Sequence, residues 1–427
     1  MKKIIATFLC ASLFIISAHA QYINLPDTLF GEFIQVNICS PCVTGSTTTG
    51  YQLDTVLSKH VTGPFGNPLA FTLSYASSNS LKYTNLQGIQ YFALANSIEC
   101  SVNTLKTIPA LPPALKILIL SEDSLTSLPP LPPTLTTLDC DNNALISGLP
   151  TLPASLKNLN CAGCQLSVLP ALPDSLTTLN CVGNYLNVLP TLPDSLQTLE
   201  CNINPLSGGL PALPPALTSL NCSYDQLTAL PALPDKLNSL YCYNNSLTGL
   251  PDLPATLADL EAENNNLLSL PSLPLRIMSL LVNNNPNLAC LPHMPSGYLE
   301  ILYTDGTAIT CQPNYFQGDP NGLQWDQNIL NFPLCTTSGI CAATGIPEVA
   351  GQSFELYPNP CTGAFHFHSS GQLGCQFIVT NVLGQMVYTG VITDDDQMVD
   401  LSNVEPGIYI MAVKTSAAAA RVIISGR

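Results

Sequence analysis

Residues 176–195 read LTTLNCVGNYLNVLPTLPDS, and the same phrase returns along the chain with a period of 20 residues. The period grows to 21 where a glycine is inserted, as at Gly148. Eleven copies fit this register, and they open at Ala95, Leu115, Leu135, Leu156, Leu176, Leu196, Leu217, Leu237, Leu257, Ile277 and Leu299. A short phrase repeated at a fixed period predicts an array of stacked coils, each of which contacts only its neighbours.

The first half of each copy has the pattern of a strand with one buried face. In residues 176–195, Leu179 and Cys181 alternate with polar residues, and side chains two apart share one face of a strand. One such strand per coil, always in the same direction, predicts a parallel sheet. Asn184 stands at the ninth place of the copy, where we expect its amide to bond backbone groups of adjoining coils.

The second half of each copy reads Leu-Pro-x-Leu-Pro, and proline excludes a helix because it lacks an amide donor. We expect polyproline II conformation, with leucines three apart facing inward and prolines covering the outside. The predicted fold class is therefore mainly β, a solenoid with a parallel sheet on its concave face and a polyproline-like convex side. One coil buries too little apolar surface to stand alone, so the array needs caps.

The segments around the repeats have different compositions. Asp27 is placed to cap a short helix early in the mature chain. Near the C-terminus, apolar and polar residues alternate in short runs separated by Gly and Asn, which predicts a small β-sandwich. We expect an N-terminal cap at 21–94, the solenoid at 95–314, a C-terminal cap and linker at 315–345, and the sandwich at 346–427.

Composition limits the partners and the compartment. The 427 residues are 46% hydrophobic but only 9% charged, and the net charge is −16. This acidic balance excludes a basic nucleic-acid footprint and disfavours an anionic membrane surface. Residues 1–20 have a basic start, an apolar run and the ending Ala-His-Ala, as in a secretory signal peptide. No later segment is long and apolar enough to predict a transmembrane segment.

The repeats resemble the short leucine-rich repeats of bacteria whose second half reads L-P-x-L-P. Some of those proteins carry a ubiquitin-ligase domain, which the β-rich C-terminus here does not match. That C-terminus resembles the type A sorting domain of type IX secretion, on the residues Tyr357, Pro358, Asn359, Pro360, Gly407, Tyr409 and Arg421. The resemblance implies export across the outer membrane by secretion machinery, to the cell surface or the medium.

Seven cysteines occupy the sixth place of the repeat: Cys100, Cys140, Cys161, Cys181, Cys201, Cys222 and Cys242. A metal or redox ladder is one interpretation of this column. However, Leu120, Ala262 and Val282 fill the same place in other copies, so the position accepts any small apolar side chain. We therefore expect these thiols to be reduced core residues.

The remaining cysteines predict disulfides. Cys290 and Cys311 hold equivalent places in adjacent coils, near the spacing that a disulfide needs. Cys335 and Cys341 close a short loop beyond the array. Cys39 and Cys42 either staple the N-terminal cap or form a redox pair, and the missing βαβ context favours the staple.

A patch of aromatic and acidic residues stands out on the exposed side of the predicted sheet. Its members come from nearby copies and are Tyr224, Tyr241, Tyr243, Glu261, Glu263 and Tyr303. Exposed aromatic residues are commoner in binding sites than on ordinary surface, although a solvated face is the alternative interpretation. No catalytic, cofactor-binding or metal-binding motif stands out, so we expect no cofactor.

Three functions remain open at this level. The first is a monomeric, secreted, non-enzymatic binding protein or adhesin whose concave face holds a protein or glycan ligand. The second is a structural component of the cell surface or matrix without a specific ligand. The third, more remote, is an enzyme whose site the sequence does not reveal.

Overall fold

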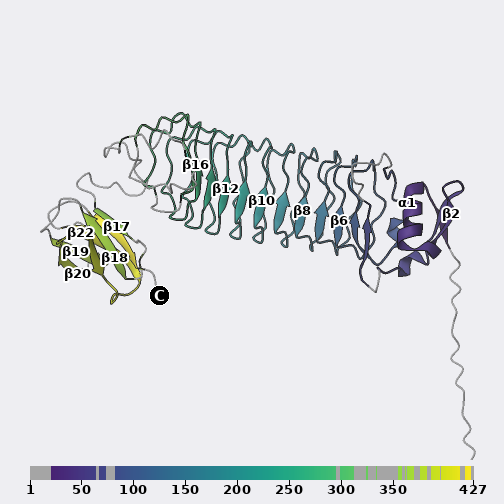
Figure 1. The fold of residues 1–427 in the computed structure, drawn as a ribbon, viewed down its shortest axis with the longest axis horizontal. Coiled ribbons are helices and arrows are strands. Elements are labelled where there is room, and N and C mark those ends of the chain that lie inside the picture. The colour runs from purple at the N-terminus through teal and green to yellow at the C-terminus, as the bar shows by residue number, and fades with distance from the viewer. Residues whose placement is uncertain are drawn as a thin grey trace, which may run out of the picture. The chain divides into compact units, whose positions relative to one another are not determined.

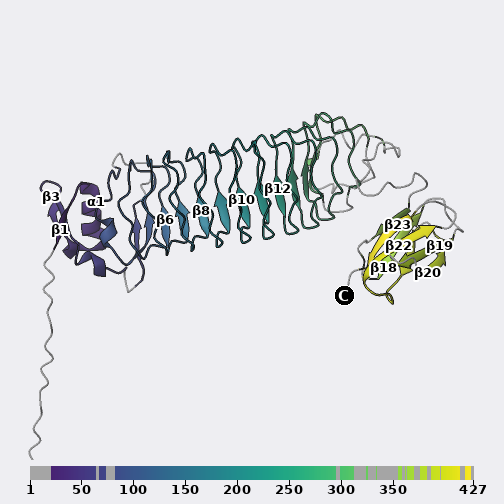
Figure 2. The same ribbon diagram turned by 180° about the vertical axis from the view of Figure 1, so that it is seen from behind.

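The computed structural model describes residues 21–63, 67–73, 82–294, 299–311, 324–325, 333, 354–357, 361, 363–369, 376–381, 386–394, 396–413 and 419–424. The chain divides into two compact units, Met1–Ala343 and Thr344–Arg427. The first unit contains the array of coils, which Figures 1 and 2 show from opposite sides. The predicted signal peptide lies outside the described residues.

A parallel sheet runs the length of the first unit, with one short strand from each coil (Figure 1). Its thirteen strands pair in sequence order. They are β4 (Leu69–Thr72), β5 (Ala95–Glu99), β6 (Ile117–Ile119), β7 (Thr137–Asp139), β8 (Asn158–Asn160), β9 (Thr178–Asn180), β10 (Thr198–Glu200), β11 (Ser219–Asn221), β12 (Ser239–Tyr241), β13 (Asp259–Glu261), β14 (Ser279–Leu281), β15 (Ile301–Tyr303) and β16 (Gln324–Trp325). The predicted fold class is confirmed.

The sheet extends beyond the repeats at both ends. β4 comes from the predicted N-terminal cap and pairs with β5, while β16 comes from the predicted C-terminal cap and linker and pairs with β15. Parallel pairing uses backbone groups, so a segment without the repeat's leucines can still add a strand. The sheet therefore includes strands from both predicted caps, neither of which carries the full repeat.

The core lies behind the sheet and is built from the fourth, sixth and eleventh places of each coil. Leu179, Cys181 and Leu186 are fully buried, as are their equivalents in the neighbouring coils. The seven cysteines of the sixth place are all buried thiols outside any disulfide. Burial disfavours the thiolate and raises the pKa of Cys181 to about 12. The prediction that this column is core filling is confirmed.

Two substitutions at Cys181 test whether the sixth place of the repeat requires only a small apolar side chain. Cys181→Val should cost less than about 1.5 kcal/mol of unfolding free energy, because Val282 already fills the equivalent place. Cys181→Asp should cost on the order of 3–5 kcal/mol, because it buries a charge without a partner. Thermal unfolding of both variants measures the difference. Alkylation of Cys181 in the folded wild-type protein, before denaturation, would contradict the burial.

The ninth place ties each coil to its neighbour, as predicted. Asn184 Nδ2 donates to the carbonyl oxygens of Cys161 and Cys181, both at 2.9 Å, and its Oδ1 accepts from the amide of Leu166 at 2.9 Å. Equivalent bonds recur at Asn143, Asn204, Asn245, Asn265 and Asn285. One amide side chain therefore satisfies two carbonyls and one N–H that the bend leaves without ladder partners.

The residue before this place has a left-handed backbone in every copy. Its members are Val102, Glu122, Asn142, Gly163, Gly183, Ile203, Tyr224, Asn244, Asn264, Asn284 and Gly306. Positive φ is costly for a branched residue such as Val102 or Ile203, so the surrounding bonds must hold it. The bend that ends each strand is thus a fixed element of the coil.

Two copies carry a carboxyl at the ninth place. Asp225 is fully buried; its Oδ1 accepts from the amide of Asn204 at 2.8 Å, and its Oδ2 accepts from the Cys201 thiol at 3.7 Å. Asp123 accepts from the amide of Leu105 through Oδ1, and its buried Oδ2 has no partner among the described residues. Burial raises the pKa of both carboxyls to about 7.

Asp225→Asn should make the solenoid more stable at neutral and alkaline pH. The raised pKa means that Asp225 favours the folded state fully below about pH 4, and that this contribution is lost as pH rises through about 7. An amide cannot ionise, and its NH₂ group adds the donor that the carboxylate lacks. The free energy of unfolding of the variant should therefore exceed that of the wild type by on the order of 2 kcal/mol at pH 8, and the difference should shrink toward pH 4. Thermal unfolding of wild type and variant between pH 4 and pH 8 measures this difference, and Asn245→Asp, which places a carboxyl where the wild type has an amide, should show the opposite trend. A stability difference that does not change with pH would contradict the ionisation of Asp225.

The second half of each coil, which holds the Leu-Pro-x-Leu-Pro sequence and leads to the next strand, differs in one respect from the prediction. The segment contains no helix and no strand between residues 181 and 197, and Leu189 and Leu192 face the core. The prolines do not cover the outside, because Pro190 is half-buried and Pro193 is buried. The Pro193 carbonyl accepts from the amide of Leu196 in a turn that leads into the next strand, and this turn draws the ring inward. The exposed residue is the one between the prolines.

The N-terminal cap closes the first coils. It contains β1 (Tyr22–Leu25), β2 (Val43–Ser46) and β3 (Gly50–Asp54), paired antiparallel in the order β1-β3-β2, with the helix α1 (Thr28–Phe33), a π-helix (Ile34–Ile38) and short 3₁₀ turns (Ser40–Cys42, Ser58–His60, Ile89–Tyr91). Asp27 caps α1 by accepting from the amides of Leu29 and Phe30, as predicted. Its other oxygen accepts from the amide and hydroxyl of Thr84, which joins the start of the cap to its last segment before the first repeat.

The second unit is a small β-sandwich, as predicted. One sheet has the order β17-β18-β21 and the other β20-β19-β22-β23. Phe365, Phe367 and Phe377 are buried between them with other apolar side chains. The strands are β17 (Phe354–Tyr357), β18 (Ala364–Ser369), β19 (Gln376–Asn381), β20 (Met386–Val391), β21 (Asp396–Asp400), β22 (Gly407–Val413) and β23 (Ala419–Ile424).

Candidate functional site

The exposed face of the solenoid sheet is formed by the third, fifth and seventh places of each coil. Over most of the array these places hold Ser, Thr and Asn, which bond one another across strands. Ser121 Oγ and Asn160 Nδ2, for example, both donate to Asp139 Oδ1. Carboxylates also stand at these places elsewhere, as at Glu99, Asp139, Asp141 and Glu200, but two tyrosines occur together only after Ser239, and three carboxylates, Asp259, Glu261 and Glu263, follow on the next coil.

The predicted tyrosines meet at this point. The rings of Tyr224 and Tyr243 pack edge to face with centroids 5.5 Å apart, and the Tyr224 amide donates to the Tyr243 carbonyl at 3.0 Å. Tyr224 is 53% exposed, while Tyr241 and Tyr243 are half-buried. Tyr241 is the last residue of β12, and Tyr243 follows two residues later at the other side of the buried Cys242, so both face away from the core. The three side chains therefore offer ring surface to solvent at the point where two adjacent strands end.

The carboxylates follow on the next coil. Strand register places Glu261 directly beside Tyr241 and Asp259 beside Ser239, whose hydroxyl donates to Asp259 Oδ2 at 3.1 Å. Partial burial, with the neighbouring Asp259, raises the pKa of Glu261. Burial, with the neighbouring Glu261, raises the pKa of Glu263, whose Oε2 is buried without a hydrogen-bond partner among the described residues. No lysine, arginine or histidine among the described residues forms an ion pair with these carboxylates, which leaves their charged form without compensation.

Tyr303 lies apart from this group. It pairs with Leu281 of β14, and Leu281 in turn pairs with Glu261, so one strand separates Tyr303 from the carboxylates. The structure brings together Tyr224, Tyr241, Tyr243, Glu261 and Glu263, which we call the tyrosine–glutamate patch. Tyr303 is a neighbour of this patch rather than a member.

No lysine or arginine occupies the third, fifth or seventh place of any copy. Lys116 and Lys157 sit at the second place, and Lys236 and Arg276 lie in turns that enter strands. The patch therefore carries carboxylates without a basic side chain at the neighbouring strand places to neutralise them. The described residues contain no group of three or more side chains suited to hold a metal ion.

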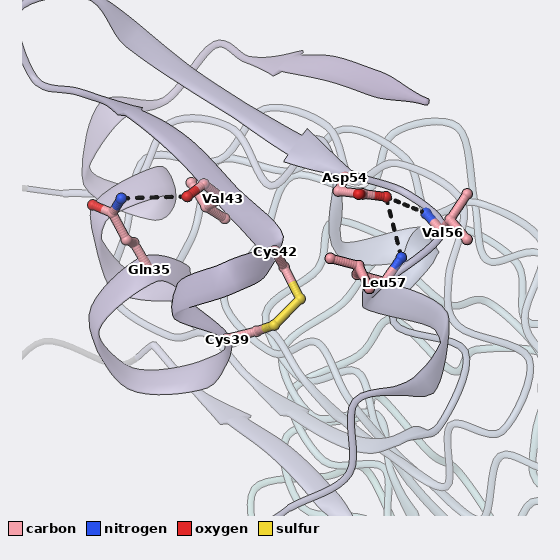
Figure 3. Close-up of a disulfide and its surroundings, with 7 residues drawn as sticks. All are labelled: Gln35, Cys39, Cys42, Val43, Asp54, Val56 and Leu57. Atoms are coloured by element: carbon pink, nitrogen blue, oxygen red, sulfur yellow. Dashed lines mark hydrogen bonds between the residues drawn. A yellow bond between two sulfur atoms is a disulfide. The ribbon is translucent and has the colours of Figure 1, made fainter. Parts of the chain in front are cut away.

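The disulfide predictions have three outcomes. Cys39 and Cys42 are joined in the N-terminal cap beside β2, where Gln35 Nε2 donates to the Val43 carbonyl and Asp54 accepts from the amides of Val56 and Leu57 (Figure 3). Cys290 and Cys311 are both disulfide-bonded, and their mutual pairing stays a prediction. Cys335 and Cys341 lie outside the described residues.

The predicted sorting residues fall in the second unit. Tyr357, at the end of β17, stacks on His366 and donates to Asp396 Oδ1 at 2.7 Å, and His366 Nδ1 lies 3.2 Å from the same oxygen. Gly407 opens β22, and Tyr409 is buried with its hydroxyl donating to the Glu405 carbonyl at 2.6 Å. Pro358, Asn359 and Pro360 lie outside the described residues.

Residues 355–425 match the family model described as the secretion system C-terminal sorting domain. The second unit is a type IX sorting domain. This domain directs export to the cell surface or the medium, and the unit that precedes it has a solenoid fold like that of leucine-rich repeats. No helix among the described residues has the length and apolar character that a membrane span requires.

Solved structures similar to this chain include other bacterial repeat proteins. YopM of Yersinia pestis, described as a leucine-rich effector protein, is 28% identical, with 63% of this chain and 86% of that chain covered and a TM-score of 0.48. YopM of Yersinia enterocolitica is 26% identical, with 61% and 79% covered and a TM-score of 0.36. A leucine-rich-repeat protein of Leptospira interrogans is 21% identical, with 53% and 77% covered and a TM-score of 0.34. No curated protein matches the chain.

Sequence reasoning missed a second set of exposed residues. Ile146, Val168, Val188 and Ile203 are each more than half exposed, and they follow the strands in the bends rather than on the sheet face. The sequence feature that could have identified them is an apolar residue at a place where other copies carry Ser, Thr, Asn or Gly. That comparison between copies identifies surface residues which the strand pattern ignores.

Deleting residues 346–427 should leave a folded solenoid that is not exported. The two units have separate hydrophobic cores, so loss of the sandwich should not unfold the coils. Cell fractionation with an antibody to the solenoid locates the truncated protein, and circular dichroism reports its fold. Truncated protein at the outer surface or in the medium would contradict the role of the tail.

Proposed function

We propose that this leucine-rich-repeat protein is a monomeric, non-enzymatic binding protein, an adhesin, whose tyrosine–glutamate patch holds a protein or glycan ligand outside the cell. The observation that supports the proposal is the joint placement of Tyr224, Tyr241 and Tyr243 beside Glu261 and Glu263. Aromatic rings held in place with low side-chain entropy are the commonest energetic anchors of interfaces.

The charge of the patch narrows its ligands. Glu261 lies beside Tyr241 in the strand register and Glu263 follows two residues later, with no basic residue at the third, fifth or seventh place of any copy. A cationic group on the ligand would supply the missing counter-charge and would lower the raised pKa values of these carboxyls. An acidic ligand would meet like charge. The patch therefore favours a basic protein segment, or a neutral sugar stacked on tyrosine.

Ligand capture from host and sibling-cell surface fractions, together with a glycan array, tests the proposal. Replacing Tyr241 and Tyr243 together by Ala should weaken the captured ligand by ~2 kcal/mol or more if the rings are anchors. Tyr22→Ala is a control, because it removes a tyrosine that is exposed on the N-terminal cap, away from the patch. Calorimetry measures the affinities, and thermal unfolding checks that the variants keep their fold.

Three results would contradict the proposal. Affinity unchanged in the double variant would place the ligand elsewhere on the surface. Absence of any captured ligand would favour a purely structural component of the surface or matrix. Turnover of a substrate by the purified protein would favour an enzyme.

A further inference from the structure

The two outer faces of the sorting domain differ in character. On the sheet β17-β18-β21, the Tyr357 hydroxyl donates to Asp396 Oδ1 at 2.7 Å, and His366 Nδ1 lies 3.2 Å from the same oxygen. Met398 pairs with His366 in the strand register and is 62% exposed. Among its described residues, this face is therefore mostly polar, and its polar groups bond one another.

The outer face of the other sheet, β20-β19-β22-β23 (Figure 2), is mostly apolar. Side chains two apart share one face of a strand, so those that alternate with the buried Phe377, Val379, Tyr409 and Met411 face outward. Met386 is 62% exposed, Ile408 47%, Ile410 44% and Val391 42%, while Ile378 and Thr380 are half-buried. None of the described side chains on this outer face is charged.

The strand register joins these residues into one patch. Thr380 pairs with Met386 on one side and with Ile410 on the other. Ile378 lies two residues before Thr380, and Ile408 lies two residues before Ile410, so both are on the same face as the row that they flank. Diagonal neighbours on antiparallel strands are within reach of long side chains, which makes Ile378 and Ile410 adjoining residues. We call Ile378, Met386, Val391, Ile408 and Ile410 the apolar face of the sorting domain.

An apolar face of this kind is unusual on a solvated sheet. An antiparallel sheet that faces water on one side normally alternates apolar residues inside with polar residues outside. Contiguous apolar patches on soluble domains mark contact surfaces more often than ordinary surface does. All four strands lie within residues 355–425, which match the sorting-domain family. The apolar face therefore belongs to the part of the chain that must be recognised for export.

We propose that the export machinery holds the sorting domain by this apolar face, and that the partner there is an uncharged, apolar protein surface. The partner covers Met386, Ile408 and Ile410. It is uncharged at that point because a charge set against these side chains would lose its hydration and gain no partner. The inference concerns export and is independent of the tyrosine–glutamate patch.

The size of the face suits a short-lived complex rather than a stable dimer of this chain. Four strands ~4.8 Å apart and about six residues long give a face of roughly 20 by 20 Å, or about 400 Å². A stable complex buries ~800 Å² on each partner, about twice this area. An exported protein must leave the machinery that carries it, so a small contact fits a sorting signal.

Met386 and Met398 offer a matched test, because they are equally exposed methionines on opposite outer faces of the sandwich. In the full-length protein, Met386→Lys with Ile410→Lys should lower the exported fraction about tenfold or more, since it sets two ammonium groups against an apolar partner. Met398→Lys should leave export unchanged. Met386→Leu with Ile410→Val, which keeps the face apolar, should also be exported normally. Cell fractionation measures export, and circular dichroism with limited proteolysis checks the fold.

A photo-reactive amino acid placed at position 386 or 398 of the full-length protein tests the contact directly in living cells. A crosslink to a component of the export machinery from position 386, and not from position 398, is the expected result. A crosslink from position 386 to a second copy of the chain, to the solenoid of the same chain or to lipid instead would overturn the inference.

The inference and the role of the tail can fail separately. Export of the double lysine variant at the wild-type level, or an equal loss of export in Met398→Lys, would overturn the inference. If the double variant does not fold, Val391→Lys at the margin of the same face decides: folded protein retained in the cell supports the inference, and normal export overturns it. If only deletion of residues 346–427 blocks export, the tail keeps its role and the recognised surface lies elsewhere on it.

Discussion

The amide side chain at the ninth place of the repeat is the interaction on which the solenoid depends. A strand of three residues makes few ladder bonds, and the chain must then reverse direction within a coil of 20 residues. The bend turns carbonyls toward the interior, where an unpaired polar group is costly. Asn184 and its equivalents pair with those carbonyls on their own coil and on the preceding one. Each coil is thus completed by its neighbour.

The same dependence explains why it matters for the fold when a carboxyl replaces the asparagine amide at the ninth place. Asp225 can accept as the amide does, but its ionised form cannot donate, so the carbonyls near it keep fewer partners. Where Asp225 or Cys164 replaces asparagine, the backbone responds in the same way: the residue after it, Gln226 or Gln165, takes a positive φ. The amides of Asp225 and Cys164 then both turn to the asparagine of the following coil. At these two places, where the asparagine amide is missing, the bend contains a second residue with positive φ and bonds to the asparagine of the following coil.

Most of the solenoid could be predicted from the sequence because the period, the strand alternation and the asparagine column are all local patterns. Leu179, Cys181 and Asn184 have the roles that their spacing indicates. The strands β4 and β16 could not be predicted in the same way, since they join the sheet through backbone pairing. Pro193 was placed wrongly because a three-residue periodicity does not foresee the turn that buries it. Of the candidate site, the repeat register predicted that Tyr224 and Tyr243 meet on adjacent coils and that Tyr303 lies two coils beyond the glutamates.

The same constraint leaves the ligand-facing surface free to vary. Leucine, cysteine and asparagine occupy the places that fold the coil, while the places between them only need to tolerate solvent. Residues at those places can differ in every copy without weakening the core, which is how tyrosines and carboxylates come to replace small polar residues on adjacent coils. The rise of one strand spacing per coil converts the order of these residues in sequence into a fixed order in space. A linear partner can be recognised by such a surface through the order of its own side chains, and a compact one through only a few adjacent coils.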